Sequence, residues 1–419
     1  MHMTGIAVKR KVRMMIKCKY LILGAGPSGL TAANMLLDKG IEDFVILEKE
    51  NIAGGLCRTQ YINGQPVDIG GGHILDTRIS KVDDFMFRFL PKEKWNFFTR
   101  DSQIYFKDQL MGSPFEAHIW QLSVKDQVEY LKTIAVAGCN LGIEKPDKFV
   151  DWINWKLGTK IAEDYMLPYN RKMFSKNLNS LGTYWLEKLP NVSFEETLMS
   201  CLEHRFYGEQ PCHSHFYYPK EEGFGDCFIR MQERLGEHFF NKIDVRKIDF
   251  TSNTVNDSFE GEHIIVAMPW TEFEEIKGMP QEIEEGLRRL KYSSVQIDYY
   301  DQKLPYDTTA QWIYYPSEAY SYHRIMVMTN FALGSHGYWT ETNAERIHLN
   351  KESSDFHYLN KYAYPHNTLE KPKIMKDLLE WAKTQCVYGL GRWGEWQHFN
   401  ADVCMERAMN LIEELTEKQ

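Results

Sequence analysis

Three glycines near the start of the chain have the spacing of a phosphate-binding turn. Gly24, Gly26 and Gly29 form G-x-G-x-x-G directly after the apolar run 20–23, and a helix-like run, 30–37, follows. The first glycine permits a tight turn, the second lets the backbone approach a pyrophosphate, and the third lets helix and strand pack closely. The N–H groups and the positive dipole at the start of the helix stabilise the phosphates. This context predicts a dinucleotide site, although the three glycines alone would also suit a turn in another fold.

An acidic residue ends the next predicted strand, 44–47. Glu48 lies 24 positions after Gly24, near the spacing at which a carboxylate accepts hydrogen bonds from the ribose hydroxyls of a dinucleotide. Pro27, Ser28 and Lys49 stand beside these residues in the sequence and are included in the predicted site.

A second glycine-rich passage begins just after this acid. Gly54 and Gly55 let the backbone pass beside a bulky ligand, and Arg58 offers a planar cation for a phosphate or an electron-rich ring. The short β-run 67–69 then leads into three glycines and His73. We interpret both stretches as backbone shaped to lie against a flat ligand. The alternative for His73 is an ordinary turn histidine.

The composition describes a globular protein and excludes several classes. The chain has 419 residues, of which 43% are hydrophobic and 14% aromatic, so two or three domains are expected. Its net charge of -9 argues against nucleic acid as a partner. The eight cysteines form no C-x-x-C pair, and the stretch 201–215 has no standard metal-ligand spacing, so we expect a cytoplasmic protein with no disulfide framework and no metal. No apolar run is long enough for a membrane span.

Periodicity divides the rest of the chain into helical and strand-rich parts. Helices are predicted at 79–90, 123–141, 149–157, 160–166, 168–174, 226–235, 375–384 and 401–415. Strands are predicted at 104–106, 109–111, 215–219, 242–250, 254–259, 263–267, 290–300, 311–315 and 325–331. The apolar strand that ends near 267 is expected to return to the first sheet, and the last three strands suggest a second, antiparallel sheet.

These motifs resemble those of a large family of FAD proteins that includes amine oxidases, protoporphyrinogen oxidase and UDP-galactopyranose mutase. The loop that ends in His73 looks like the histidine loop of the mutases, which lies on the flavin face. The stretch 321–325 resembles the strand whose arginine binds the substrate diphosphate, and this arginine maps to Arg324. The stretch 362–365 is similar to the tyrosine-proline segment that also contacts the diphosphate, and 391–400 looks like the closing flavin motif.

The resemblance implies an α/β fold with three functional parts. A Rossmann-like FAD-binding domain is expected to carry a helical insertion and an antiparallel-sheet substrate domain. The expected boundaries are a basic tail at 1–18, the FAD-binding domain at 19–80, 206–270 and 386–419, a mainly helical insertion at 81–205, and the substrate domain with helical segments at 271–385.

The resemblance also implies which residues hold each ligand, with His73 and Arg324 as the catalytic residues. The expected FAD contacts are Gly24, Gly26, Pro27, Ser28, Gly29, Glu48, Lys49, Gly55, Leu56, Arg58, Gly71, Gly72, His73, Val245, Gly391, Arg392, Phe399 and Asn400. The expected substrate contacts are Tyr169, Asn170, Lys188, Arg324, Tyr362, Tyr364 and His398.

The chain departs from the family's pattern at two places. His398 and Asn400 stand where bacterial mutases carry a tyrosine and an aspartate. The family's second diphosphate arginine has no clear counterpart, and Lys188 is the nearest cation. A lysine in that place would weaken bidentate phosphate binding.

Structural roles are the alternatives for several of these residues. Arg324 would then form a surface ion pair, Tyr364 would pack in a core, and Arg58 and Arg392 would form salt bridges.

The function implied by the resemblance is a flavin-dependent mutase for cell-surface polysaccharide synthesis. It would interconvert the pyranose and furanose forms of a UDP-galactose-like nucleotide sugar through an adduct between the sugar and N5 of reduced FAD. NADPH or NADH is the candidate reductant, and a homodimer is the candidate assembly. The alternatives are an FAD-dependent oxidoreductase of the amine oxidase or protoporphyrinogen oxidase type, and a flavin-binding protein without catalysis.

Overall fold

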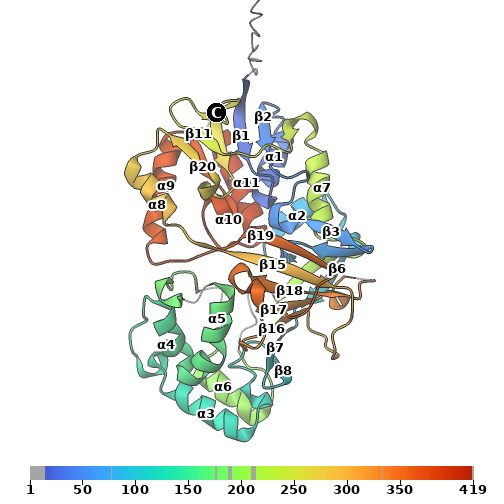
Figure 1. The fold of residues 1–419 in the computed structure, drawn as a ribbon, viewed down its shortest axis with the longest axis vertical. Helices are drawn as coiled ribbons and strands as arrows, with labels where there is room; N and C mark the ends of the chain where they lie inside the picture. The colour runs from blue at the N-terminus through green and yellow to red at the C-terminus, as the bar shows by residue number, and fades with distance from the viewer. Residues whose placement is uncertain are drawn as a thin grey trace, which may run out of the picture.

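Three layers follow one another along the long axis of the molecule (Figure 1). A sheet flanked by helices forms one end, a seven-stranded sheet forms the middle, and a group of helices forms the other end. The computed structural model describes residues 15–76, 78–174, 177–186, 191–208, 214–332 and 334–417. Lys188, Cys212 and residues 1–14 of the expected tail lie outside these ranges.

The first layer is built on the predicted β-turn-α unit. Strand β1 (Ile16–Leu23) lies between β2 (Phe44–Leu47) and β13 (Phe259–Val266), parallel to both, and helix α1 (Pro27–Asp38) follows it. The return of the strand near residue 267 to this sheet is therefore confirmed. The other strands of the sheet are β10 (Phe239–Phe240), β11 (Lys247–Asp249), β12 (Thr254–Val255), β14 (Glu275–Lys277) and β20 (Val387–Gly389).

The start of β1 corrects the expected boundary of the basic tail. Ile16 pairs with Phe259 and Cys18 with Gly261, so residues 16–18 belong to the strand. The side chains of β1 alternate between two cores because successive residues of a strand point to opposite faces. Tyr20 and Ile22 pack with α1 and with α7 (Gly225–Glu233) and α11 (Ala401–Glu417).

The opposite face of this sheet carries two helices that the sequence placed in the substrate domain. Leu21 and Leu23 share a core with Leu287 of α8 (Gln281–Arg288) and Leu378 of α9 (Lys371–Thr384). β14 also pairs with β11 in this sheet. The expected substrate domain at 271–385 therefore begins and ends within the first layer, because these apolar helix faces cover a sheet built far away in sequence.

The second layer is a mainly antiparallel sheet with the order β19-β15-β18-β17-β16-β7-β8. Its strands are β7 (Ser102–Phe106), β8 (Gln109–Gly112), β15 (Tyr292–Tyr300), β16 (Trp312–Tyr314), β17 (Arg324–Val327), β18 (Tyr338–Asn343) and β19 (Phe356–Pro365). The hairpin of β7 and β8 was predicted, but it was assigned to the helical insertion. In the structure β7 pairs in parallel with β16, so 81–205 is not one helical unit.

Two small sheets connect the first two layers. One contains β3 (Thr59–Ile62) and β4 (Gln65–Asp68), and the other contains β5 (Leu75–Asp76), β6 (Trp95–Thr99) and β9 (His215–Pro219). Helix α2 (Ser80–Phe87) lies between β5 and β6 in sequence.

The third layer consists of α3 (Val124–Ala135), α4 (Phe149–Ile161), α5 (Leu167–Met173) and α6 (Phe194–Glu203). A π-helical turn, Ala162–Met166, joins α4 to α5. α4 itself is kinked at Gly158, which has φ of 74°, and a Cβ there would lie 2.5 Å from the carbonyl oxygen of Thr133 on α3. Within the described residues, the helices lack the combined length and apolar character that a membrane span requires.

Candidate functional site

Two neighbouring cavities share part of their walls. One, of 260 Å³, lies at the carboxyl ends of β1 and β2, and the other, of 370 Å³, lies between the seven-stranded sheet and the helices of the third layer. Leu56, His73, Arg392 and Ala401 line both cavities. The two cavities therefore form one groove that runs from the first glycine turn, past the histidine loop, to the helical layer.

Most residues of the predicted dinucleotide site line the first cavity. It is lined by Gly24, Gly26, Pro27, Ser28, Glu48, Lys49, Gly55, Leu56, Arg58, His73, Val245, Arg392 and Phe399. This position is the expected one, because ligands of α/β sheets bind outside the carboxyl ends of the strands.

Three of the predicted glycines do not line the first cavity but support the chain segments that form its wall. A Cβ on Gly29 would lie 2.0 Å from the carbonyl oxygen of Gly24, and a Cβ on Gly391 would lie 1.9 Å from Oγ of Ser28. Gly71, with φ of 99°, faces the carboxylate of Glu341 in the same way. These glycines let chain segments approach closely, so the wall itself depends on them.

The carboxylate of Glu48 is held by two backbone amides. Its Oε2 accepts from the N–H of Ala25 at 2.8 Å, and its Oε1 accepts from the N–H of Glu50 at 2.9 Å. Each carboxylate oxygen has a second lone pair, so the group can still accept from a ligand hydroxyl. Arg58 donates to Oη of Tyr358 and lies 3.4 Å from the carboxylate of Glu50.

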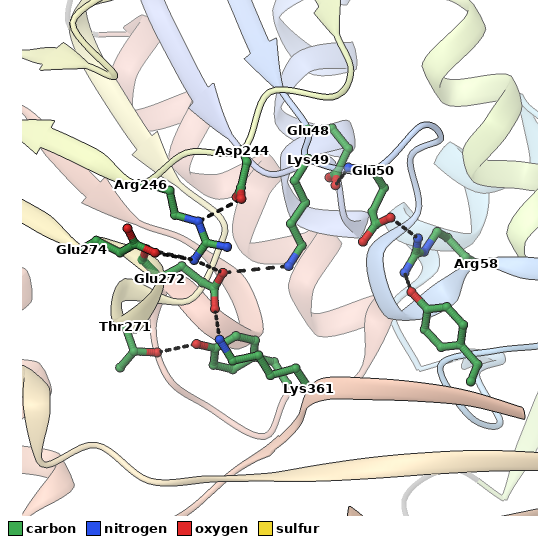
Figure 2. A network of polar contacts seen from close by, with 12 residues as sticks. Glu48, Lys49, Glu50, Arg58, Asp244, Arg246, Thr271, Glu272, Glu274 and Lys361 are labelled. Carbon is green, nitrogen blue, oxygen red and sulfur yellow. Dashed lines mark hydrogen bonds and ion pairs between the residues drawn. The ribbon is translucent and has the colours of Figure 1, made fainter.

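A network of charges lines the wall beside Glu48 (Figure 2). Glu272 is buried, and its carboxylate lies 2.6 Å from Nζ of Lys361, 2.8 Å from Nη1 of Arg246 and 3.9 Å from Nζ of Lys49. Burial alone would raise the pKa of Glu272, but the hydrogen bond from Lys361 and the neighbouring cations lower it. The predicted ligand residue Lys49 is thereby drawn toward Glu272, as Figure 2 shows.

His73 is neutral and oriented. Its Nδ1 lies 3.0 Å from the carbonyl oxygen of Gly71, and because a carbonyl only accepts, we assign the proton to Nδ1. Burial, together with the nearby charge of Arg392, lowers the pKa of His73 to about 4. Nε2 is then an acceptor at the place where the two cavities meet.

Arg392 supplies a cation at the same junction. Its Nη1 donates to the carbonyl oxygen of Phe399 at 2.9 Å and its Nη2 to that of Ala363 at 2.7 Å. Its Nε is buried without a partner, and no carboxylate pairs with it, among the residues that the structure describes. Arg392 therefore has carbonyl contacts, with one donor unused, in place of the salt bridge that was the structural alternative.

Arg324 lines the second cavity as half of a buried pair. Its Nη2 lies 2.6 Å from both carboxylate oxygens of Glu341, and Oη of Tyr364 lies 3.2 Å from the same carboxylate. Burial would raise the pKa of Glu341, but Arg324 lowers it strongly. The alternative of a surface ion pair for Arg324 is wrong, since Glu341 is buried. Sequence reasoning missed Glu341 because β18 was not predicted.

Arg100 is a second guanidinium in this cavity, and it was also missed. Its Nη2 donates to Oη of Tyr314 at 3.0 Å, its Nε donates to Oγ of Ser102 at 2.9 Å, and its guanidinium lies 4.2 Å from the ring centroid of Trp312. Burial would raise the pKa of Tyr314, but Arg100 and Arg324 together lower it. The two arginines therefore flank one phenol hydroxyl.

The remaining predicted substrate residues divide between the cavities. Tyr169, Asn170, Tyr364 and His398 line the second cavity, together with Gly72 and Asn400, which were predicted as FAD contacts. Tyr362 lines the first cavity instead, so the two tyrosines lie in different cavities. The pairing of β19 with β15 shifts register between Tyr364 and Asn360, and this irregularity turns Tyr362, which lies between them, toward Thr271. Lys188 lies outside the described residues.

Sequence comparisons match parts of the chain to known proteins. A model of the NAD(P)-binding Rossmann-like domain matches residues 22–89. Tryptophan 2-monooxygenase of Allorhizobium ampelinum is 44% identical over 50 residues, which are 12% of this chain and 7% of that protein. An uncharacterised protein of Methanothermococcus thermolithotrophicus is 32% identical over 107 residues, which are 24% of this chain and 97% of that protein.

Solved structures match along nearly the whole chain. A reduced UDP-galactopyranose mutase has a TM-score of 0.87 at 22% identity, with 96% of this chain and 94% of that chain covered. A protoporphyrinogen oxidase-like protein of Exiguobacterium has a TM-score of 0.69 at 14% identity over 96% of this chain and 99% of its own. Putrescine oxidase bound to putrescine has a TM-score of 0.63 at 14% identity over the same shares.

Proposed function

For a chain that belongs to the family of the uncharacterised Methanothermococcus protein and has the fold of UDP-galactopyranose mutase, protoporphyrinogen oxidase and the amine oxidases, we propose the function of an FAD-dependent nucleotide-sugar mutase. It interconverts the pyranose and furanose forms of the sugar. The observation that carries the proposal is the single groove, with dinucleotide-type residues in one half and two arginines in the other.

The first half of the groove fits FAD. Gly26 and Gly55 approach closely enough that a Cβ on Gly55 would lie 3.1 Å from Cα of Gly26, so the backbone is open to a pyrophosphate there. Glu48 accepts from the ribose, and the unused Nε of Arg392 lies at the junction where the flavin ring is expected. When bound and reduced, the flavin supplies a nucleophile for the anomeric carbon of the sugar.

The protein residues position the sugar and the leaving diphosphate. His73 presents Nε2 as an acceptor at the junction, which suits a reduced ring that carries an N–H donor. Arg324 and Arg100 bind the diphosphate, with Tyr314 as an additional hydrogen-bond donor, while Tyr364 donates to Glu341 beside Arg324. Arg100 takes the place of the second family arginine, for which Lys188 was the expected substitute.

Catalysis by reduced protein tests the proposal. Purified protein is expected to contain FAD, and after anaerobic reduction with dithionite it should convert UDP- or GDP-hexopyranoses into furanose forms. Chromatography and NMR of the sugar ring detect the product. The same protein with oxidised flavin is the matched control and should be inactive.

Two outcomes would contradict this function. A protein that retains no FAD would remove the basis of the mutase and of the oxidoreductase. Bleaching of oxidised flavin by an amine or a porphyrin-like substrate, with peroxide formed in air and no ring contraction of any sugar, would favour the oxidoreductase instead.

A further inference from the structure

One acidic residue of the second cavity has no ion-pair partner among the described residues. Glu116 lines this cavity and is only 7% exposed. Its carboxylate accepts from its own backbone N–H and is influenced by the charge of Lys156, but within the described residues no side chain forms a hydrogen bond or ion pair with it. Burial raises the pKa of Glu116 to about 7, because an ionised carboxylate at this buried position costs free energy in the protein without ligand.

A row of aromatic rings indicates the direction from the arginines to this acid. The ring of Tyr314, which Arg100 contacts, meets Tyr169 at 5.6 Å between centroids. Tyr169 stacks with Tyr165 at 5.9 Å, and Tyr165 stacks with Phe115 at 5.1 Å, next to Glu116 in the chain. The groove therefore runs from His73, through the arginines, to an aromatic end.

The side chains of this groove follow the order of the three parts of a nucleotide sugar, which are the sugar, the diphosphate and the base. The other two acids of the second cavity are paired, Glu341 with Arg324 and Asp76 with Arg78. The sugar would lie at the flavin, the diphosphate at Arg324 and Arg100, and the base among the aromatic side chains. The aromatic side chains that line this cavity include Phe115, Trp152, Tyr165 and Trp185. Aromatic side chains of this kind stack on bases without choosing between them.

We propose that the nucleotide of the substrate carries guanine and that Glu116 selects it. Guanine has two adjacent N–H donors, N1–H and the N2 amino group, and a carboxylate accepts both. The inference rests on the proposed function, since it assumes that a nucleotide sugar occupies the groove. It adds the base, which the fold does not determine.

The other bases fit this carboxylate less well. Uracil presents one N–H between two carbonyl oxygens, so an ionised acid would face at least one acceptor. Adenine and cytosine each present one amino group beside a ring acceptor. A bidentate match of charge-assisted hydrogen bonds discriminates by about 1–3 kcal/mol, which is about tenfold or more in affinity.

Equilibrium binding of nucleoside diphosphates to the full chain tests this selection. Calorimetric titrations with GDP, UDP, ADP and CDP at mildly alkaline pH should show GDP as the tightest ligand, by about tenfold or more over UDP. Glu116→Gln should weaken GDP binding by a similar factor and shift the preference toward UDP, because an amide offers one donor and one acceptor to the uracil edge. Glu144→Gln, an exposed acid in the same layer, should leave the ranking unchanged.

The possible results distinguish a failure of the guanine selection from a failure of the mutase proposal. UDP, ADP or CDP bound as tightly as GDP by the unaltered protein would overturn the selection and leave the mutase proposal intact. An unchanged ranking in Glu116→Gln would do the same. If no nucleoside diphosphate binds, the proposed function itself fails. The ranking by the unaltered protein decides the question even where the variant does not fold.

Discussion

At the scale of single residues, the second cavity separates two kinds of arginine. Arg324 is already neutralised by Glu341, with which it forms a buried pair. Arg100 is bonded only to neutral hydroxyls, those of Ser102 and Tyr314, within the described residues. An anion that enters the cavity therefore gains more from Arg100 than from a cation that already has a carboxylate.

Replacement of Arg100 tests this difference. Arg100→Ala should lower the affinity for a nucleoside diphosphate at least about tenfold, since a largely desolvated guanidinium-phosphate contact is lost. Affinity for the corresponding nucleoside should change little. Calorimetric titration measures both ligands.

The matched control is Arg171→Ala, an exposed arginine on α5. It should leave both affinities unaltered. Equal losses for the nucleoside and its diphosphate in Arg100→Ala would mean that Arg100 only supports the packing of Trp312.

At the scale of elements, short helices and turns bring the groove together. The helix α10 (Gly391–Gly394) carries Arg392 to the junction of the cavities. Its first residue has φ of 72° and lies against Ser28 at the start of α1. The closing segment of the chain therefore depends on a residue without a Cβ for its contact with the first glycine turn.

Two glycines with nearly equal φ values isolate the effect of this contact. Gly142 has φ of 71°, and a Cβ there would meet no atom within 4 Å, whereas a Cβ on Gly391 would lie 1.9 Å from Oγ of Ser28. Gly142→Ala should cost about 1–2 kcal/mol of unfolding free energy from the left-handed backbone alone. Gly391→Ala should cost about 1–3 kcal/mol more from overpacking, and should release the flavin more readily. Denaturant titration and the flavin content of purified protein measure the two effects; equal costs would show that α10 can move away from Ser28.

At the scale of the whole molecule, buried histidines make stability depend on pH. His366 is buried between Ser293, whose Oγ lies 2.7 Å from Nε2, and the ring of Phe174. Burial, with the charge of Lys291, lowers its pKa to about 4. Since the folded value lies below the unfolded value near 6.5, His366 contributes stability that is present above pH 6.5 and is lost as the pH falls toward 4.

Removal of this histidine should flatten the pH profile. In that window His366→Gln should reduce the slope of unfolding free energy against pH by up to about 1.4 kcal/mol per pH unit. His348→Gln, at an exposed position, serves as the control. Denaturant titrations at several pH values give the slopes, and parallel profiles for His366→Gln and the unaltered protein would contradict a neutral buried imidazole. Burial raises the pKa of Asp68 to about 7, so the contribution of Asp68 to the slope of unfolding free energy against pH has the opposite sign. The comparison between variants is therefore more informative than the profile of one protein.

The sequence by itself determined the first half of the groove. The run into β1, the three glycines, α1 and Glu48 are consecutive, and their structure follows from local propensity and glycine geometry. For the same reason the hairpin of β7 and β8 and most helices could be predicted, while their assignment to layers could not.

Only the tertiary structure decided how the second half is assembled. Arg100 meets Tyr314 across 214 positions of sequence because β7 pairs with β16, and no local pattern encodes such a pairing. Glu341 reaches Arg324 through β18, a strand of buried polar residues without the alternation that reveals strands. Glu116 lies in a segment with no regular periodicity, so its role depends on the helices and rings that fold around it.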